Sequence, residues 1–415
     1  MQVKIYDNGL AVIVEENAGL RSVTAGIMVG AGSAYETPEN NGISHFIEHT
    51  QFKGTARRSA EDIVREFDEA GSVYNAFTGK EYTCYYFKSI DENLEKCFDV
   101  LSDLFLRSEF AAEQLDRERK VILEEINMSK DEPDGVCYDV LYRHIFDGSL
   151  GMEILGTKDN VSRFNKADVL DYKRAHYIPE NTVVAFVGNI KAEQAYALVE
   201  KYMPELISAE KTVKPTYAVQ CFKPGYAEYI HDYEQSEISV AYPSFSLGDD
   251  RAVTLSALDC MLGNGMSSRL FQRIREKMGL CYSVYTSPWL GKHGGVFTVC
   301  ANVNAPNAGA CIKAVKEEIQ KLLDKGVTET EVKKAKTQLK VNALFGKENP
   351  MNYMLSMMRR RILLGEDYDL DKILQKIDNV SVGAVNELAR EIFSQKGALA
   401  YAGKAEKGLY EIFND

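Results

Sequence analysis

The stretch Glu69-Ala70-Gly71-Ser72-Val73-Tyr74 has a counterpart later in the chain, Lys277-Met278-Gly279-Leu280-Cys281-Tyr282, and the two align without gaps. Each follows a predicted helix, over residues 60–70 and 268–278, and each leads into strand-like sequence, at 81–90 and 294–303. A predicted amphipathic helix comes next in both places, at 94–106 and 310–323. The pattern indicates one unit of roughly 200 residues that occurs twice in the chain.

The repeat predicts two domains, at residues 1–210 and 220–415. The run at 181–190, rich in Thr, Val and Phe, is typical of a buried strand that closes the first half. The junction between Pro204 and Pro224 has a third proline and little helical periodicity. Strands and helices fall mostly in separate runs, so we expect an α+β fold in place of a strictly alternating parallel sheet.

Composition excludes several classes of protein. The net charge of −12 argues against general nucleic-acid binding, which needs a basic surface. Values of 45% hydrophobic and 27% charged residues exclude wholesale disorder. The sequence shows neither a signal peptide nor an apolar run of about 20 residues, so we expect no membrane contact and a cytoplasmic location. The eight cysteines are scattered singly, which favours reduced thiols over a thiolate metal site.

Two of the six histidines lie within five residues, in His45-Phe46-Ile47-Glu48-His49. In a helix, positions i and i+4 share one face, so both imidazoles can reach one metal ion. Imidazole nitrogen suits Zn²⁺, and Glu48 can take a proton from a water that the metal has made acidic. The alternative is a pair of helix histidines that only pack or face solvent, because short motifs produce false positives.

A third ligand is offered by the predicted helix over residues 116–126. Glu118 and Glu125 are seven positions apart and share a face with Ile122, which indicates partial burial. Glu124 points about 100° away, toward a charged face. Glu125 is therefore the better candidate ligand, and Glu118 can orient a ligand from behind. The alternative is a charged helix face in solvent.

The second half of the repeat serves as an internal control. Aligning Phe110 with Val327 places Ala335 at the position of Glu118 and Asn342 at that of Glu125. The second half also lacks a counterpart of the histidine pair. Histidines and carboxylates are thus missing from the same copy, as a single metal site in one copy predicts.

Residues 45–49, the sequel Phe52-Lys53-Gly54-Thr55 and Glu125, 76 positions after His49, resemble the pitrilysin-type (M16) zinc metallopeptidases. The resemblance spans nearly the whole chain. The length of the chain is similar to that of the family's short members, which include the mitochondrial processing peptidase β subunit and bacterial homodimeric peptidases. The resemblance implies two homologous α/β sandwich domains, each a mostly antiparallel sheet covered by helices. It also implies that His45, His49 and Glu125 bind zinc, that Glu48 is the catalytic base, and that Glu118 assists catalysis.

Two further matches concern the substrate. The segment with Asn75, Ala76 and Phe77 resembles the family's edge strand, whose backbone pairs with an extended peptide. Arg275 and Tyr282 match a pair that in the family holds the substrate backbone and assists catalysis, and an Arg with a Tyr hydroxyl suits an oxyanion. The alternatives are an ordinary strand and a surface arginine. Thr50-Gln51 stands where the family usually has an apolar pair, which leaves the polarity beside the metal helix open.

The resemblance implies a zinc metalloendopeptidase that cleaves unfolded oligopeptides or leader segments. In the family's long members four such domains form a closed chamber, and this chain has two, so a homodimer with peptide substrates is expected. The alternative is a non-catalytic peptide-binding or scaffold subunit of the same family. A different metallohydrolase, acting on small molecules, is a further alternative.

Overall fold

The computed structural model describes residues 1–414, which form two compact units. Unit 1 consists of Met1–Ile126, Met152–Tyr217 and Gly346–Tyr368. Unit 2 consists of Asn127–Gly151, Ala218–Phe345 and the segment from Asp369 onward. Each unit therefore contains one piece of chain that lies, in sequence, within the opposite half.

Unit 1 is built on a six-stranded sheet in the order β1-β2-β6-β3-β5-β4. Its strands are β1 (Gln2–Ile5), β2 (Ala11–Glu16), β3 (Ser22–Val29), β4 (Val73–Thr78), β5 (Thr83–Ile90) and β6 (Thr182–Gly188). Only the β2–β6 pairing is parallel, so the sheet is mostly antiparallel. β4 forms an open edge of this sheet.

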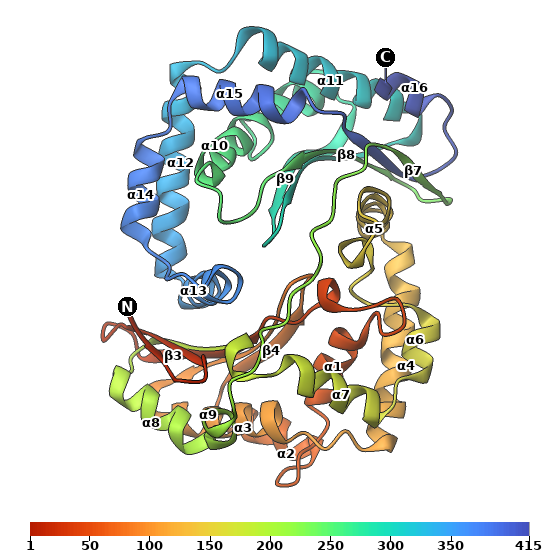
Figure 1. The fold of residues 1–415 in the computed structure, drawn as a ribbon. Helices are drawn as coiled ribbons and strands as arrows, with labels where there is room; N and C mark the ends of the chain where they lie inside the picture. Colours follow the sequence, from red (N-terminus) through yellow and green to blue (C-terminus); the bar gives the residue numbers. More distant parts are fainter. Residues whose placement is uncertain (415) are drawn as a thin grey trace. The chain divides into compact units, whose positions relative to one another are not determined.

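The helices of unit 1 cover both faces of the sheet (Figure 1). They are α1 (Ile43–Gln51), α2 (Ala60–Glu69), α3 (Leu94–Arg107), most of α4 (Ala112–Met128), α6 (Lys158–Arg163), α7 (Lys166–His176), α8 (Ala192–Tyr202), α9 (Pro204–Ser208) and α13 (Pro350–Leu364). α3 and α8 pack on one face, against β5 and β2, and α13 packs against β3 and β6 on the opposite face.

Unit 2 contains a five-stranded sheet in the order β7-β11-β8-β10-β9. The strands are β7 (Gly225–Ile230), β8 (Ser236–Ser244), β9 (Cys281–Leu290), β10 (Gly295–Val303) and β11 (Ala398–Gly403). Its helices are α5 (Pro133–Ile145), α10 (Ala252–Leu262), the π-helix η6 (Phe271–Lys277), α11 (Ala308–Lys325), most of α12 (Glu329–Glu348), α14 (Leu370–Asp378), α15 (Val382–Phe393) and α16 (Leu409–Asn414). Short 3-10 turns lie at Ser33–Tyr35, Asp91–Asn93, Ser129–Asp131, Ser149–Gly151, Pro179–Asn181 and Ala305–Asn307.

The two sheets repeat one topology. Leaving β1 aside, the order β2-β6-β3-β5-β4 corresponds to β7-β11-β8-β10-β9, and the first pairing is parallel and the others antiparallel in both. The repeated turn is conserved in backbone shape, because Gly71 has φ 59° and Gly279 has φ 61°. An α-left conformation of this kind is costly for residues with a Cβ atom. The predicted duplication and the α+β class are confirmed.

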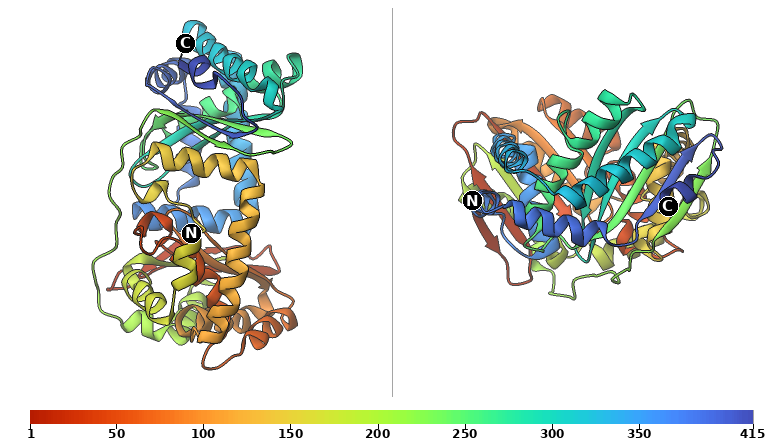
Figure 2. Two further views of the ribbon diagram at one scale, coloured as in Figure 1. Left: turned by 90° about the vertical axis from the view of Figure 1, so that its right-hand side faces the viewer. Right: turned by 90° about the horizontal axis from the view of Figure 1, so that it is seen from above.

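One helix of each unit comes from the opposite half of the sequence. α5 precedes the 210–220 junction but packs against β7, β8 and β11 of unit 2, where it crosses below the strands in the left view of Figure 2. α13 follows the junction but packs against β3 and β6 of unit 1. The compact units therefore differ from the contiguous division at 1–210 and 220–415 by a symmetric exchange of two helices.

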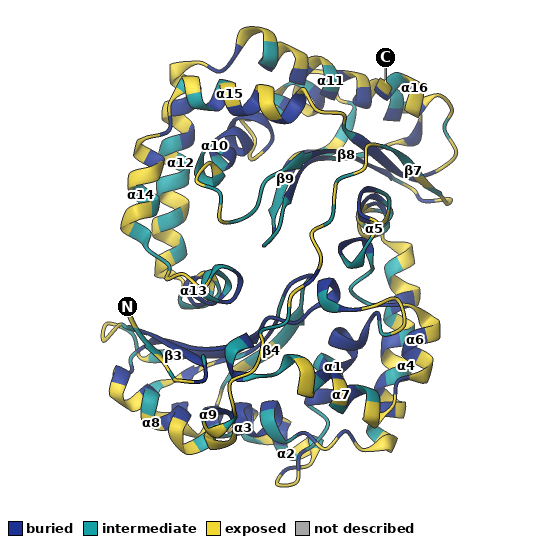
Figure 3. Cartoon of the chain, in the orientation of Figure 1, coloured by how far each residue is buried: buried dark blue, intermediate teal, exposed yellow. Residues whose placement is uncertain are grey.

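Each unit has its own apolar core between its sheet and the helices of one face. In unit 1 this core includes Ile27, Phe87 and Phe186, and in unit 2 it includes Val240 and Phe297. In Figure 3 the central strands are largely dark blue and the outer helix faces yellow, because helices cover both faces of the sheet in unit 1. No helix within residues 1–414 is long and apolar enough to cross a membrane.

The predicted helix at 268–278 differs from expectation in its hydrogen bonding. Over Phe271–Lys277 it is a π-helix, with the amide of Met278 donating to the carbonyl of Arg273, five residues back. A π-turn widens the helix and shifts the side chains on it, and such turns occur frequently at functional sites. Arg275 lies on this helix.

Candidate metal and active site

The histidine pair lies on α1, a short helix whose start is held by a buried carboxylate. Gly42 precedes the helix with φ 98°, and Glu36 accepts hydrogen bonds from the amides of Gly42 and Ser44, at 2.7 and 2.8 Å. Burial raises the pKa of Glu36, and these bonds offset part of that effect. The carboxylate accepts hydrogen bonds from backbone amides that have no partner inside the helix at its start. The start of α1 is therefore fixed, and the helix presents both histidines on one face.

The two carboxylates come from α4. Glu118 is buried and Glu125 is partly buried, whereas Glu124 is exposed, in agreement with the predicted faces of this helix. Ile122 is fully buried between them. The helix therefore presents Glu118 and Glu125 inward, as the seven-residue spacing requires.

His45, His49 and Glu125 form one group, in which the three candidate ligand atoms lie within 4.8 Å of one another. The Oε2 atom of Glu125 lies 3.4 Å from Nε2 of His49 and 3.7 Å from Nε2 of His45. Ligands of tetrahedral Zn²⁺, at about 2.0–2.1 Å from the metal, lie roughly 3.3 Å apart. Two imidazoles and one carboxylate at these separations fit a zinc ion with a fourth position free.

The charges around the group favour ligand chemistry. Burial, together with the charge of His49, lowers the pKa of His45 to about 3, so its imidazole is neutral and can donate a lone pair. Burial acts against a charged His49, but the hydrogen bond to Glu118 and the nearby carboxylates raise its pKa overall. A metal cation placed among these groups would be attracted by the same carboxylates.

Glu118 lies behind the histidine pair. Its Oε2 atom is 3.5 Å from Nδ1 of His49, and its Oε1 atom is 3.0 Å from the ammonium of Lys53. Burial would raise the pKa of Glu118, but the bonds from His49 and Lys53 hold it below its usual value. A carboxylate on the rear nitrogen fixes the tautomer and orientation of an imidazole that faces a metal.

Glu48 is held by the end of the edge strand. The hydroxyl of Thr78, the last residue of β4, donates to Oε2 of Glu48 at 2.5 Å. Burial raises the pKa of Glu48, and the bond from Thr78 opposes that rise. A carboxylate with a raised pKa beside a metal group suits a catalytic base.

The edge strand β4 exposes backbone groups. It pairs on one side with β5, with Ala76 opposite Tyr85. The amide of Ala76 donates to Oδ1 of Asn75, its neighbour, at 2.8 Å, instead of joining the ladder. Asn75 and Phe77 lie on either side of it, and the strand has no partner on its outer edge within the described residues. The geometry is that of a strand able to accept one more.

Arg275 and Tyr282 come together in unit 2. The guanidinium of Arg275, on η6, lies 4.7 Å from the ring centre of Phe271 and 5.8 Å from that of Tyr282. Tyr282, near the start of β9, is 76% exposed. A guanidinium between two rings is oriented by them, and the exposed tyrosine presents its hydroxyl to solvent.

The polar pair after the second histidine is fully buried and paired. Thr50 donates through its hydroxyl to the carbonyl of Phe46 at 2.7 Å, and Gln51 donates through Nε2 to the carbonyl of Phe105 at 2.9 Å. These side chains bind the backbones of α1 and α3. Through the bond from Gln51 to Phe105, the pair therefore attaches the end of α1 to α3.

Lys173 of α7 joins this contact. Its ammonium donates to the carbonyl of Phe105 at 2.8 Å and to Oε1 of Gln51 at 3.1 Å, and it lies 5.1 Å from the ring centre of Phe110. Phe110 is buried, has φ 49° and stands just before α4. Lys173 thus touches the segments that carry both sets of candidate ligands.

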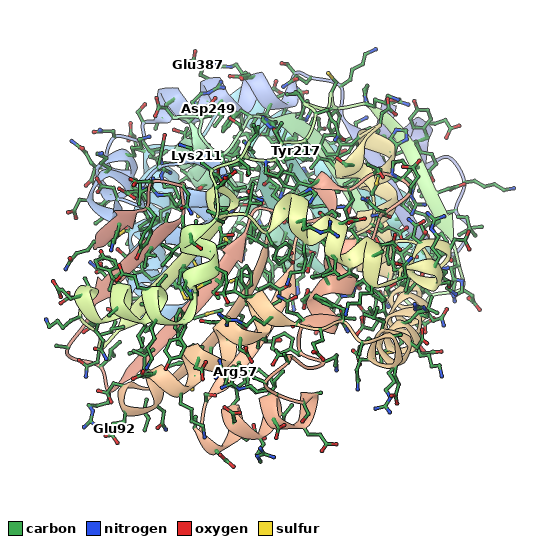
Figure 4. The ribbon with its side chains drawn as sticks, turned by 60° about the horizontal axis from the view of Figure 1, so that its bottom comes forward. Arg57, Glu92, Lys211, Tyr217, Asp249 and Glu387 are labelled. Atoms are coloured by element: carbon green, nitrogen blue, oxygen red, sulfur yellow. The ribbon has the colours of Figure 1, made fainter. Side chains whose placement is uncertain are left out.

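A second network fixes the segment after α1. Arg57, labelled in Figure 4, pairs with Asp99 of α3 through Nη1 at 2.9 Å. Arg58 pairs with Asp99 and with fully buried Asp103, at 2.8 and 2.9 Å. The hydroxyl of Thr55 also donates to Asp103, at 2.7 Å. These contacts hold the Phe52–Thr55 sequel of the motif against α3.

The structure brings His45, His49, Glu125, Glu48 and Glu118 together in unit 1. Four supporting residues were not found from the sequence: Glu36, Lys53, Thr78 and Lys173. Lys53 and Thr78 stand inside the two segments that carry the resemblance, which was the available signal. Glu36 and Lys173 act across longer stretches of chain and left no local pattern.

Comparison with known proteins identifies the family. Residues 11–158 match the family described as insulinase (peptidase family M16), and residues 163–339 match the peptidase M16 inactive domain. The chain is 35% identical over 397 residues to the uncharacterized zinc protease YmxG of Bacillus subtilis, covering 95% of this chain and 96% of that protein. An uncharacterized zinc protease of Streptomyces coelicolor is 34% identical over 402 residues, covering 95% and 88%.

A solved structure shares the fold. The crystal structure of a protease from Helicobacter pylori superimposes with a TM-score of 0.90 at 21% identity, covering 97% of this chain and 99% of that one. The resemblance that the motifs indicated is therefore confirmed over both halves: the chain belongs to peptidase family M16.

Proposed function

We propose that the protein is a zinc-dependent endopeptidase that cleaves unfolded oligopeptides or leader segments. The observation that carries the proposal is the group of His45, His49 and Glu125, with Glu48 adjacent and hydrogen-bonded to the end of an open edge strand. Relatives called zinc proteases support the same class of activity.

The chemistry follows from these side chains. A zinc ion held by His45, His49 and Glu125 supplies a Lewis acid that polarises a carbonyl and makes water acidic. Glu48 accepts the proton of the attacking water and then donates it to the leaving amine. Thr78 orients the Glu48 carboxylate, and Glu118 keeps His49 in place from behind.

The substrate is held as an added strand. An extended peptide that pairs with β4 receives main-chain hydrogen bonds at Ala76, where Asn75 now occupies the outward amide. Main-chain pairing gives affinity without requiring one particular sequence. Because β4 ends at Thr78, which binds Glu48, a peptide in register with β4 has a defined position relative to the base.

We propose a homodimer with two active sites that enclose the peptide. Arg275 and Tyr282 belong to a different compact unit from the histidines, and one chain carries both sets. In the proposed assembly, the oxyanion or neighbouring backbone is stabilised by Arg275 of the partner subunit and Tyr282 of the partner subunit. Such an interface is isologous, since each copy supplies the same surfaces.

Metal content and cleavage test the proposal together. The purified protein is analysed for bound metal by plasma mass spectrometry and incubated with a random peptide library, whose products are sequenced. We expect about one zinc per chain and cleavage that is lost in Glu48→Gln with zinc retained. Glu125→Gln loses zinc, and Glu124→Gln, one residue away on the exposed face, serves as the matched control.

Three outcomes contradict the proposal. A zinc-loaded wild type that cuts no peptide favours the non-catalytic peptide-binding or scaffold subunit instead. Hydrolysis confined to small amides favours a different metallohydrolase. A protein that stays monomeric in sedimentation while it cleaves peptides fully rejects the homodimer but not the peptidase.

A further inference from the structure

A pocket of about 360 Å³ lies in unit 2, between α5 and the sheet. It is lined by residues of α5, β8, β9 and β10, among them Tyr138, Tyr142, Glu237, Trp289 and Cys300. None of its lining residues belongs to the metal group or to the Arg275 and Tyr282 pair. The pocket lining is therefore separate from the candidate metal site and from the Arg275 and Tyr282 pair.

Strand alternation explains why polar and aromatic side chains gather there. On β8, Ile238 and Val240 belong to the apolar core, so Glu237 and Ser239 point to the opposite face. On β10, Val299 belongs to the core, and its neighbours Thr298 and Cys300 line the pocket. The pocket is thus formed on the sheet face that is covered by the exchanged helix α5, opposite the core helices.

The pocket is acidic at its base. Glu237 is only 3% exposed and accepts a hydrogen bond from the side chain of Asn302. Asp134, near the start of α5, is the other charged residue of the lining, and the lining contains no lysine, arginine or histidine. A buried carboxylate whose pocket offers no positive charge is costly in its ionised form unless a ligand brings that charge.

The walls are aromatic. Tyr138 and Tyr142 stack at 4.1 Å between ring centres, and Trp289 meets Tyr142 edge-on at 6.1 Å. Tyr285 of β9 completes this side of the lining. Faces of Trp and Tyr attract cations within about 6 Å, more strongly where water is excluded. Carboxylate and rings select together for an organic cation with an apolar stem.

We propose that this pocket binds the ammonium or guanidinium group of a Lys or Arg residue in the peptide that the enzyme cleaves. The inference rests on the proposed peptidase function for the identity of the ligand, but the pocket's preference for a cation does not depend on it. The stem of either side chain packs against the rings while its charged end reaches Glu237.

The affinity is expected to depend on pH. Burial, with the charge of Asp134, raises the pKa of Glu237 to about 7. Of the other titratable groups around it, Tyr138 on α5, Tyr285 on β9 and Cys300 on β10 have pKa values raised by burial and remain neutral near pH 7. A cation therefore binds more tightly at pH 8 than at pH 6, because it needs the ionised carboxylate.

The chain offers a direct reporter, because Trp289 is its only tryptophan. Intrinsic fluorescence is followed while the intact protein is titrated with N-acetyl-lysine methylamide, N-acetyl-arginine methylamide or the neutral N-acetyl-norleucine methylamide. We expect a saturable change with the two cationic probes and an affinity at least about tenfold weaker for the neutral probe, as a lost charge-assisted contact predicts.

Variants locate the effect. Glu237→Gln lowers the affinity for the cationic probes by about tenfold or more and removes the pH dependence, whereas Glu234→Gln, exposed three residues earlier, changes neither. Circular dichroism of Glu237→Gln checks its folding, and Asp134→Asn, at an exposed position, gives a second and smaller loss should that variant misfold. Equal affinities for norleucine and lysine probes in the wild type overturn the cation preference.

Cleavage then identifies the source of the cation. Pairs of peptides are compared that differ only by Lys or norleucine, with the changed position moved along the peptide. At one of these positions the Lys peptide has a KM at least about fivefold lower than the norleucine peptide, and Glu237→Gln removes the difference. If cadaverine binds as tightly as the lysine probe and no peptide position responds, the ligand is a free amine and the peptide assignment is wrong. Probe binding without any peptide cleavage contradicts the peptidase function but supports cation binding in the pocket. Peptide cleavage without probe binding supports the peptidase function and contradicts cation binding in the pocket.

Discussion

Lys173 offers a test of the packing behind the metal group through its protonation. Burial lowers its pKa to about 7, from an ordinary value of 10.5. Between these two pH values the folded protein holds Lys173 neutral while the unfolded chain is protonated there. The free energy of unfolding therefore rises with pH in this window, by about 1.4 kcal/mol per pH unit at most. Below pH 7 both states are protonated, so the destabilisation is complete and no longer changes.

The magnitude for Lys173→Met follows from these values. Between pH 7.5 and 9.5, a site with pKa values of about 7 folded and 10.5 unfolded adds about 2.5 kcal/mol to the stability of the wild type. The methionine variant lacks this titration. It also leaves Oε1 of Gln51 without its lysine donor and the carbonyl of Phe105 with only the donor from Gln51, which costs about 1–3 kcal/mol at every pH. The wild type is thus favoured at pH 9.5, and its advantage shrinks or reverses at pH 7.5.

Urea unfolding followed by circular dichroism at four pH values from 7.5 to 9.5 measures this difference. The matched control is Lys166→Met, at the exposed start of the same helix, for which the difference from wild type stays constant. If the Lys173→Met difference is also constant within about 0.5 kcal/mol over two pH units, the lysine is charged throughout and the reasoning from burial fails.

Three further results are expected. Glu118→Gln weakens zinc affinity by about 10–100-fold, measured by competition with a chelator, and unchanged affinity would show that Glu118 does not orient His49. Thr78→Val lowers kcat/KM about tenfold or more with zinc content unchanged, while Thr78→Ser retains the hydroxyl and most of the rate. Equal rates for the two variants would exclude a role for the contact with Glu48. Ala76→Pro removes an outward amide of the edge strand, so peptide kcat/KM falls at least about tenfold with the metal still bound, whereas an intact rate would rule out strand pairing at this residue.

Local patterns carried much of the fold and of the candidate site. The predicted helix at 94–106 is α3 (Leu94–Arg107), and the predicted strand at 294–303 is β10 (Gly295–Val303), because amphipathic periodicity identifies such a helix and β-forming residues identify such a strand. His45 and His49 share a turn, and Glu118 and Glu125 share a face, so their spacing was sufficient to place each pair on one side of a helix.

Contacts between distant segments could not be predicted in this way. Thr78 meets Glu48 across 30 residues, and Lys173 meets Gln51 across 122, through packing that no spacing rule encodes. A lysine near polar residues in sequence normally indicates a solvated face, so burial of Lys173 contradicts the usual preference. The exchange of α5 and α13 could not be predicted for the same reason, because the apolar face of a helix does not determine which sheet it packs against.

The symmetric exchange of α5 and α13 links the two units by topology. A chain cut in the 210–220 junction yields two fragments, each of which lacks a helix that its own sheet uses and carries one that it does not need. Neither fragment can complete its fold alone, and the pair should assemble by complementation. An arrangement in which equivalent elements trade places is that of a swapped dimer, here fused into a single polypeptide.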